Sequence, residues 1–292
     1  MKGSTKLWIQ GARPKTLPAA IAPVVVGAAC AQLSVASQNN WSNAFLALIV
    51  SLALQVAVNF ANDYSDGVRG TDKNRVGPLR LVGSGAKSPV AVKRATFVAF
   101  GIAAVFGLAL AATTSWWVLP VGVLCFFSGW FYTGGKNPYG YLGLGEVFVF
   151  VFFGVVATMG TTFVINQTLT TESFLSSVVV GCLACALLAV NNLRDIAGDT
   201  LANKRTLAVR LGDKGARKFY VALFVVAGIT VCLVAVSHLT ALLALIGLLA
   251  AIKPIKRVVR GATGAELIEV LAMTGRVQMI VALSLSIGLL VG

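Results

Sequence analysis

The 292 residues are 57% hydrophobic and only 12% charged, and the mean hydropathy is +0.85. Because a soluble domain has about 25% charged residues, this composition excludes an ordinary soluble protein and predicts an all-α, polytopic membrane protein. The net charge of +14 would suggest nucleic-acid binding in a soluble protein, but the placement of the basic residues along this chain explains it differently. We expect a lipid bilayer as the surroundings and no nucleic acid as a partner.

Residues 1–16 carry four basic side chains together with Leu7, Trp8 and Ile9. This mixture predicts an amphipathic segment on the cytoplasmic surface of the membrane. A signal peptide is disfavoured, because the apolar run that follows is long and has no convincing cleavage site.

Nine apolar runs of membrane-spanning length come next and predict nine transmembrane helices in a bundle around a central cavity. The runs cover residues 17–35, 43–62, 91–113, 116–132, 142–165, 174–193, 219–237, 239–253 and 277–291. The breaks near 114 and 238 rest on length, because an apolar stretch of about 40 residues must fold back as a hairpin. We treat the 292 residues as a single integral membrane domain.

All basic residues fall on one side of this arrangement. The connections that follow odd-numbered spans contain no lysine or arginine, and the other side holds all 24. By the positive-inside rule that side is cytoplasmic, which predicts a cytoplasmic N-terminus at the cell membrane. Nine of the ten acidic residues also lie on or near this face, which topology alone does not require.

Two acidic clusters stand at the cytoplasmic ends of apolar runs. They are Asn62-Asp63-Tyr64-Ser65-Asp66 with Asp72 farther on, and Asn191-Asn192-Leu193-Arg194-Asp195-Ile196-Ala197-Gly198-Asp199. The offset between Asn62 and Asn191 equals that between Asp66 and Asp195, 129 residues, which indicates a pseudo-repeat near 62–72 and 191–199. Residues four apart share a helix face, so each cluster presents several oxygen ligands together. Facing carboxylates and carboxamides predict a Mg²⁺ site shared with a substrate phosphate. Ordinary polar capping of two helix ends explains one such residue in each cluster, but not all of them.

The cytoplasmic connections add cations and glycines. They contain Arg69, Lys73, Arg75, Arg80, Gly83-Ser-Gly85-Ala-Lys87, Tyr132-Thr-Gly-Gly-Lys136 and Asn203-Lys204-Arg205-Thr206. Glycines flanked by cations can bind a diphosphate, although this spacing is not a Walker motif. Carboxylates, Mg²⁺ and cations in a lipid-facing bundle suggest a diphosphate on a lipid tail. Ionisation of an allylic diphosphate leaves a carbocation that an aromatic ring can capture, with no protein nucleophile.

These motifs resemble the UbiA superfamily of membrane prenyltransferases over almost the whole chain. The family elements NDxxDxxxD, DxxxD and YxxxK match Asn62 to Asp66, Asp195 to Asp199 and Tyr132 to Lys136. The chain departs from the first element, because Gly70 stands where its last Asp belongs and Asp72 follows two residues later. Further stretches resemble the 1,4-dihydroxy-2-naphthoate branch: residues 12–18, 75–80, 191–212 and 274–276.

The resemblance implies a role for most of these polar residues. Mg²⁺ ligands would be Asn62, Asp63, Asp66, Asp195 and Asp199, with Asp72 as a displaced ligand. Asp63, Asp66, Asp195, Asp199 and Lys136 would be catalytic. Diphosphate contacts would be Asn62, Arg69, Lys73, Arg80, Tyr132, Lys136, Lys204 and Arg205. Arg276 and Asn192 would contact the aromatic acceptor.

The implied reaction joins a polyprenyl chain from an allylic polyprenyl diphosphate to 1,4-dihydroxy-2-naphthoate, with loss of diphosphate and CO₂, and gives demethylmenaquinone. An alternative enzyme keeps the fold and uses another acceptor, such as 4-hydroxybenzoate, homogentisate, a haem or a sugar phosphate. A secondary transporter is the main alternative from another class, but its polar residues should lie near the bilayer midplane. A purely structural role leaves two matched acidic clusters unexplained. Prenyl chain length and oligomeric state stay open.

Overall fold

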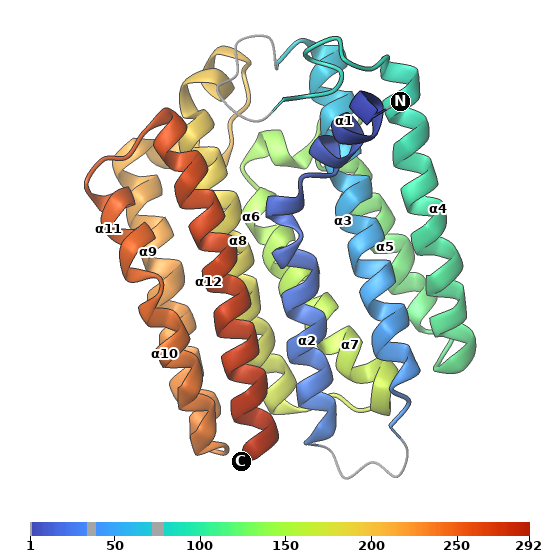
Figure 1. The fold of residues 1–292 in the computed structure, drawn as a ribbon, viewed down its shortest axis with the longest axis vertical. Helices are drawn as coiled ribbons and strands as arrows, with labels where there is room; N and C mark the ends of the chain where they lie inside the picture. The colour runs from blue at the N-terminus through green and yellow to red at the C-terminus, as the bar shows by residue number, and fades with distance from the viewer. Residues whose placement is uncertain (1, 34–38, 72–78) are drawn as a thin grey trace.

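The computed structural model describes residues 2–33, 39–71 and 79–292, and in these ranges it contains helices and no strand. Asp72, Lys73 and Arg75 therefore lie outside the described residues. The elements are α1 (Lys2–Ala12), η1 (Pro14–Thr16), α2 (Pro18–Gln32), α3 (Ser42–Arg69), α4 (Pro89–Thr113), α5 (Val118–Phe131), η2 (Tyr139–Leu142), α6 (Gly145–Val149), η3 (Phe150–Val156), α7 (Ala157–Asn166), α8 (Thr171–Leu201), α9 (Leu207–Ala235), η4 (Leu239–Leu242), α10 (Leu243–Leu249), α11 (Ile252–Val259) and α12 (Gly264–Val291). Figure 1 shows the long helices side by side along one axis of the molecule.

The helices confirm an all-helical, multi-pass membrane fold. Six described helices are long and apolar enough to cross a bilayer, and two pairs bent by 52° and 46° raise the number to eight. The remaining apolar helix, α5, has 14 residues, about 21 Å of helix against about 30 Å of hydrocarbon. The predicted count of nine spans is therefore not confirmed.

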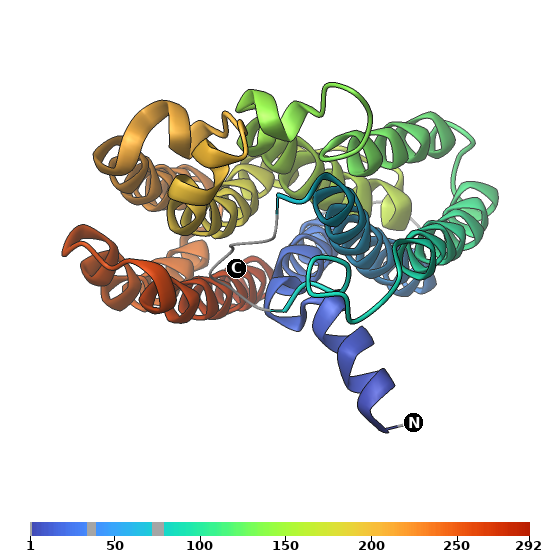
Figure 2. The same cartoon turned by 90° about the horizontal axis from the view of Figure 1, so that it is seen from above.

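Helix α8 lies at the centre of the bundle. Of its most apolar stretch 78% is buried, against 33% for α3 and for α4. Its buried side chains share one core with those of α2, α9 and α12. Viewed from above, the helices surround a central region to which α3 and α8 both contribute (Figure 2). The central helix therefore brings the second acidic cluster to the interior.

The C-terminal end of α3 is determined by its sequence. Gly70 has a left-handed backbone (φ 73°) and terminates the helix, a conformation that glycine adopts without steric cost. The turn returns the amide of Thr71 to the carbonyl of Asp66 at 3.1 Å. The last turn of α3 is thereby closed directly beside the first acidic cluster.

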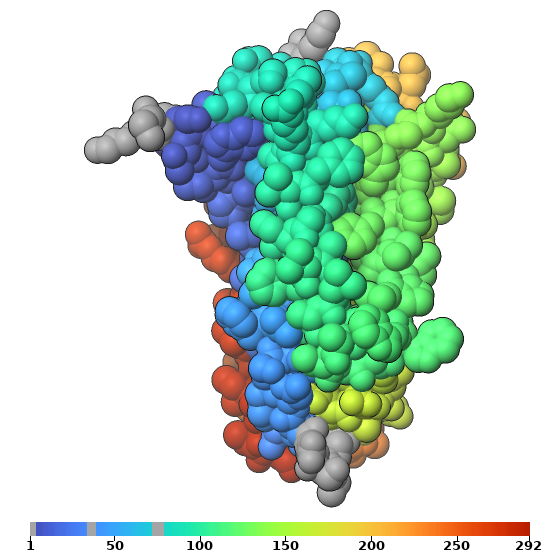
Figure 3. Space-filling model, turned by 90° about the vertical axis from the view of Figure 1, so that its right-hand side faces the viewer, coloured from blue at the N-terminus to red at the C-terminus, as the bar shows by residue number. Residues whose placement is uncertain are grey.

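The predicted amphipathic segment forms α1, which packs on the outside of α3. The Trp8 ring lies edge-on to Phe60, with 5.6 Å between ring centroids, and Lys87 Nζ lies 5.3 Å from the centre of the Trp8 ring. Figure 3 shows α1 standing out at one end of the molecule, beside the face formed by α4 and α5. The position of α1 on a membrane surface stays a prediction.

Helices α6 and α7 are joined by a π-helical segment, Phe150–Val156. The segment itself passes close to α8: a Cβ on Gly154 would lie 2.6 Å from the Cα of Gly181. Only glycines permit this approach of two backbones. The π-helical turn widens the helix next to a cavity, a common place for such turns.

Candidate active site

A cavity of about 1540 Å³ runs through the bundle between α2, α3, α4, α5, α7 and α8. Its polar end contains Asp66, Arg80 and Asp199, and its other end reaches apolar residues such as Leu110 and Val164. Polar groups lie at one end and a long apolar passage follows. This division suits a ligand with an anionic head and a hydrocarbon tail.

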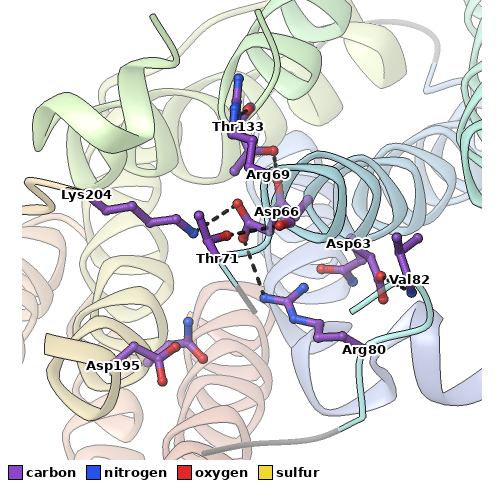
Figure 4. A network of polar contacts seen from close by, with 12 residues as sticks. Asp63, Asp66, Arg69, Thr71, Arg80, Val82, Thr133, Asp195 and Lys204 are labelled. Atoms are coloured by element: carbon purple, nitrogen blue, oxygen red, sulfur yellow. Dashed lines mark hydrogen bonds and ion pairs between the residues drawn. The ribbon is translucent and has the colours of Figure 1, made fainter. Parts of the chain in front are cut away.

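Asp66 is the centre of the polar end (Figure 4). One carboxylate oxygen accepts a hydrogen bond from the Tyr141 hydroxyl at 2.7 Å and lies 2.9 Å from Lys204 Nζ. The other oxygen lies 4.0 Å from the guanidinium of Arg80. All three charged side chains are at least about nine-tenths buried. The first acidic cluster and two predicted diphosphate contacts therefore meet at one carboxylate.

The ring of Tyr141 contacts two cations, Lys204 and Arg69. The Lys204 ammonium lies 4.7 Å, and the Arg69 guanidinium carbon 5.2 Å, from the centre of its ring, close enough for cation–π attraction. Burial raises the pKa of the Tyr141 hydroxyl above its ordinary value, and the adjacent Asp66 carboxylate raises it further. The hydroxyl therefore stays a hydrogen-bond donor.

Asp63 does not face this cavity. Its two carboxylate oxygens accept hydrogen bonds from the backbone amides of Leu81 (2.8 Å) and Val82 (2.9 Å), and the residue is completely buried. A metal ion in the cavity cannot be reached by oxygens that point into the loop behind α3 (Figure 4). The structure thus places Asp63 as the anchor of the loop that carries Arg80, in contrast to the predicted metal ligand.

Asn62 and Tyr132 line the cavity as predicted. The Asn62 carboxamide oxygen accepts a hydrogen bond from the Thr133 hydroxyl at 2.8 Å. The Arg69 guanidinium donates to the carbonyl oxygens of Thr133 and Gly135. Arg69 therefore ties the end of α3 to the connection after α5, and it does not line the cavity.

The second cluster reaches the cavity from α8. Asn191, Asn192, Asp195 and Asp199 all line it. Arg194 donates to both oxygens of Asp195 (2.7 and 2.8 Å) and to the carboxamide oxygen of Asn191 (2.8 Å). The Thr206 hydroxyl lies 3.5 Å from Asp199. Both acidic clusters thus contribute side chains to one cavity, Asn62 and Asp66 from the first and these four residues from the second.

The donor chemistry of this end fits Mg²⁺. Carboxylates and carboxamides supply hard oxygens, and Mg²⁺ is commonly held by one or two carboxylates together with substrate phosphates and water. Within the described ranges no three Asp, Glu, His or Cys side chains lie close enough to hold a metal by themselves. The residues therefore suit a metal that arrives with a diphosphate, rather than a closed protein site.

Besides Asp63 and Arg69, five predicted residues lie apart from the cavity lining or cannot be placed. Lys136, Arg205 and Arg276 are exposed and do not line the cavity. Asp72 and Lys73 lie outside the described residues. Arg276 was expected at the head of the last span, but α12 begins at Gly264 and places it a full three turns inside the helix, on an outward face.

The sequence analysis missed a polar network at the turn between α1 and α2. Thr16 Oγ1 accepts hydrogen bonds from Gln55 and Asn59, both at 3.1 Å, and Asn59 also donates to a backbone carbonyl of α1 at 2.9 Å. Arg13 adopts a left-handed backbone (φ 53°) there, and Arg13 and Lys15 both line the cavity. A signal was present, because Gln55 and Asn59 are polar residues four apart inside an apolar run.

Tyr141 and Arg194 were also missed. Arg194 lies inside the second acidic motif, and its spacing from Asn191 and Asp195 could have indicated the contact. No pattern in the sequence indicates that Tyr141 reaches Asp66, 75 residues away.

Comparison with known proteins agrees with this geometry. Residues 20–269 match the UbiA prenyltransferase family. The chain is 49% identical to the 1,4-dihydroxy-2-naphthoate octaprenyltransferase of Mycobacterium tuberculosis, covering 76% of this chain and 75% of that protein. It is 39% identical to the enzyme of the same name from Escherichia coli, covering 78% and 75%.

Solved structures share the fold at low sequence identity. A UbiA homolog from Aeropyrum pernix superposes with a TM-score of 0.72 at 16% identity, covering 92% of this chain and 97% of that one. A UbiA homolog from Archaeoglobus fulgidus bound to DMAPP and Mg²⁺ gives a TM-score of 0.70 at 14% identity, covering 97% and 99%. The match to residues 20–269 and the identities of 39–49% therefore show that this chain belongs to the UbiA prenyltransferase family.

Proposed function

We propose that the protein is a 1,4-dihydroxy-2-naphthoate polyprenyltransferase that acts on an allylic polyprenyl diphosphate. The observation that carries the proposal is the cavity in which Asp66, Lys204 and Arg80 meet at the polar end of a long apolar passage. The names of the bacterial relatives at 39–49% identity support the choice of acceptor.

The polar end is suited to hold the diphosphate. Lys204 and Arg80 supply positive charge, and the Tyr141 hydroxyl supplies a donor beside them. Asn62, Asp66, Asp195 and Asp199 would hold Mg²⁺ against the diphosphate. When bound, Mg²⁺ would withdraw negative charge from the leaving group.

The apolar passage would take the prenyl chain. Its walls come from α3, α4, α5 and α7, with Phe126, Phe152 and Val156 among the lining residues. Apolar walls bind the hydrocarbon tail and exclude water, which would otherwise capture the allylic cation.

The acceptor's carboxylate would lie near Arg13 and Lys15. Both side chains line the cavity at the turn between α1 and α2, whereas Arg276 is exposed. We therefore assign the predicted carboxylate contact to Arg13 and Lys15 in place of Arg276.

The reaction then needs no strong general base. The allylic C–O bond breaks, and a new C–C bond forms at the ring carbon that carries the carboxylate. Loss of CO₂ returns its bonding electrons to the ring, so the product is the reduced, quinol form of demethylmenaquinone. His238, the only histidine of the chain, is outside the residues that line the cavity.

We further propose that the polar end is cytoplasmic and that nine segments cross the cell membrane as one domain. The six long helices, the two bent pairs and the short helix α5 supply nine segments among the described residues. The two termini lie toward opposite ends of the molecule, as an odd number requires (Figure 1). A transporter would place its polar site near the middle of the bilayer, whereas this cavity is polar at one end.

Carboxylate-labelled naphthoate tests the function. Purified protein with Mg²⁺ and a long-chain allylic diphosphate should release labelled CO₂ in step with prenylated product, and EDTA should stop both. Prenylation of 4-hydroxybenzoate with its carboxylate retained, while the naphthoate is inert, would assign the protein to another acceptor. Lack of any transfer would remove the enzyme proposal.

A further inference from the structure

A buried carboxyl group next to the cavity has no role in the chemistry described above. Glu146, at the start of α6, is 5% exposed, and one of its oxygens accepts a hydrogen bond from the Asn192 carboxamide nitrogen at 2.9 Å. Its other oxygen has no hydrogen-bond partner among the described residues. An acidic side chain inside a membrane bundle is costly, and an apolar residue of similar size would pack α6 at lower cost.

Asn192, the partner of Glu146, lies on the cavity wall. On α8 it stands between Leu188, in the apolar part of the cavity, and Asp195, in the polar end. It lies three residues from Asp195, about 4.5 Å along the helix axis in the direction of the apolar part. A substrate whose diphosphate is held at the polar end would extend its first carbons toward the apolar part, past the wall that Asn192 lines.

The hydrogen bond with Glu146 determines the orientation of the Asn192 carboxamide. The Glu146 oxygen accepts its hydrogen bond from the amide nitrogen of Asn192, so this nitrogen is held at the buried carboxyl group. The carbonyl oxygen of Asn192 is then the end left for a ligand in the cavity. A carbonyl oxygen at this level can accept a hydrogen bond from a ring hydroxyl of the acceptor.

We propose that Glu146 is a positioning residue that turns the Asn192 carbonyl oxygen toward a hydroxyl group of the aromatic acceptor. A hydrogen bond from that hydroxyl raises the electron density of the ring and so favours attack on the allylic cation. This inference rests on the proposed function and deepens it: it makes the protein selective for acceptors with a free hydroxyl group near the reacting carbon.

The test compares 1,4-dihydroxy-2-naphthoate with its two mono-O-methyl ethers. In the wild type, one ether should have a kcat/KM about tenfold or more below that of the parent, since loss of one hydrogen bond to a buried group has about this effect. Glu146→Met removes the acceptor for the amide nitrogen, and Asn192→Leu removes the carbonyl oxygen itself. Both should lower kcat/KM for the parent toward the value of that ether, and the KM for polyprenyl diphosphate should stay unchanged.

An exchange variant separates orientation from packing. The double change Glu146→Gln with Asn192→Asp keeps the total charge, lets the new amide donate to the new carboxylate, and again leaves an oxygen for the cavity. It should restore preference for the parent over the ether. Glu172→Gln, which removes an acid at the other end of α8, is the matched control and should leave all constants unchanged.

Three results would overturn the inference. They are an unchanged preference in folded Glu146→Met, an unchanged preference in Asn192→Leu, and an exchange variant that folds without regaining preference. If Glu146→Met does not fold, Asn192→Leu and the exchange variant still test the inference. A wild type that does not prenylate the naphthoate refutes the proposed function itself, whereas an active wild type with unaffected variants refutes this inference alone.

Discussion

Replacing Asp63 by asparagine tests whether this residue anchors a loop or binds metal. The change keeps the size of the side chain but turns one of its two acceptor oxygens into a donor. One of the backbone amides of Leu81 and Val82 then loses its partner, and because Asp63 is completely buried, water cannot replace it. Hydrogen bonds to charged groups contribute about 1.5–3 kcal/mol and an unsatisfied buried donor costs about 1–3 kcal/mol, so we expect a loss of about 3 kcal/mol.

The assay has two parts, thermal unfolding in detergent and a titration of turnover with Mg²⁺. Asp63→Asn should lower the unfolding midpoint and, by loosening the loop that carries Arg80, raise the KM for the diphosphate. The Mg²⁺ concentration that gives half-maximal turnover should not change. Asp66→Asn is the contrast, because it should remove nearly all turnover. An unchanged midpoint in Asp63→Asn, with a raised Mg²⁺ requirement, would refute the loop-anchor reasoning.

Three further predictions follow from the site and the topology. Tyr141→Phe should lower kcat/KM about tenfold by removing the donor to Asp66; an unchanged value would exclude that contact from catalysis. Burial raises the pKa of Tyr141, so its hydroxyl stays protonated at pH 10.0, the ordinary tyrosine pKa, and its stabilising effect declines only above that pH. The tyrosinate absorbance of the wild type and of Tyr141→Phe should therefore be equal at pH 10.0. Single cysteines at Lys136 and Glu172 in a cysteine-free background should label from the cytoplasm and from outside, respectively, and labelling of both from one side would contradict the topology.

The helical class of the fold and the polar end of the cavity could be predicted from the sequence. Hydropathy reports burial in lipid, and the spacing of four between Asn62 and Asp66 places both on the face that lines the cavity. The ends of the helices were harder to predict from the sequence. Helix α8 continues to Leu201, eight residues beyond the predicted span, because a polar helix face can extend past the hydrocarbon. Hydropathy detects where lipid ends and does not detect where a helix ends.

Neighbouring residues in a motif were the main source of error. Asp63 is one residue from Asn62, which rotates its side chain by about 100° around the helix and turns it toward the loop. Arg205 follows the buried Lys204 in the connection between α8 and α9 and is exposed. A motif gives residue types in order, whereas the face that each residue occupies depends on how the helix packs.

The π-helical segment Phe150–Val156 changes the register of the helix Gly145–Asn166 that contains it. Thr162 and Asn166, beyond the segment, donate to the carbonyls of Gly27 and Ala31 on α2 at 2.9 Å each. A π-helical turn holds one residue more than an α-helical turn, so deleting one residue within the segment would convert it to an α-helix and keep both contacts in place. This helix can therefore lose one residue at the segment and keep its packing on α2, whereas the same deletion in a regular α-helix would rotate everything beyond it by about 100°.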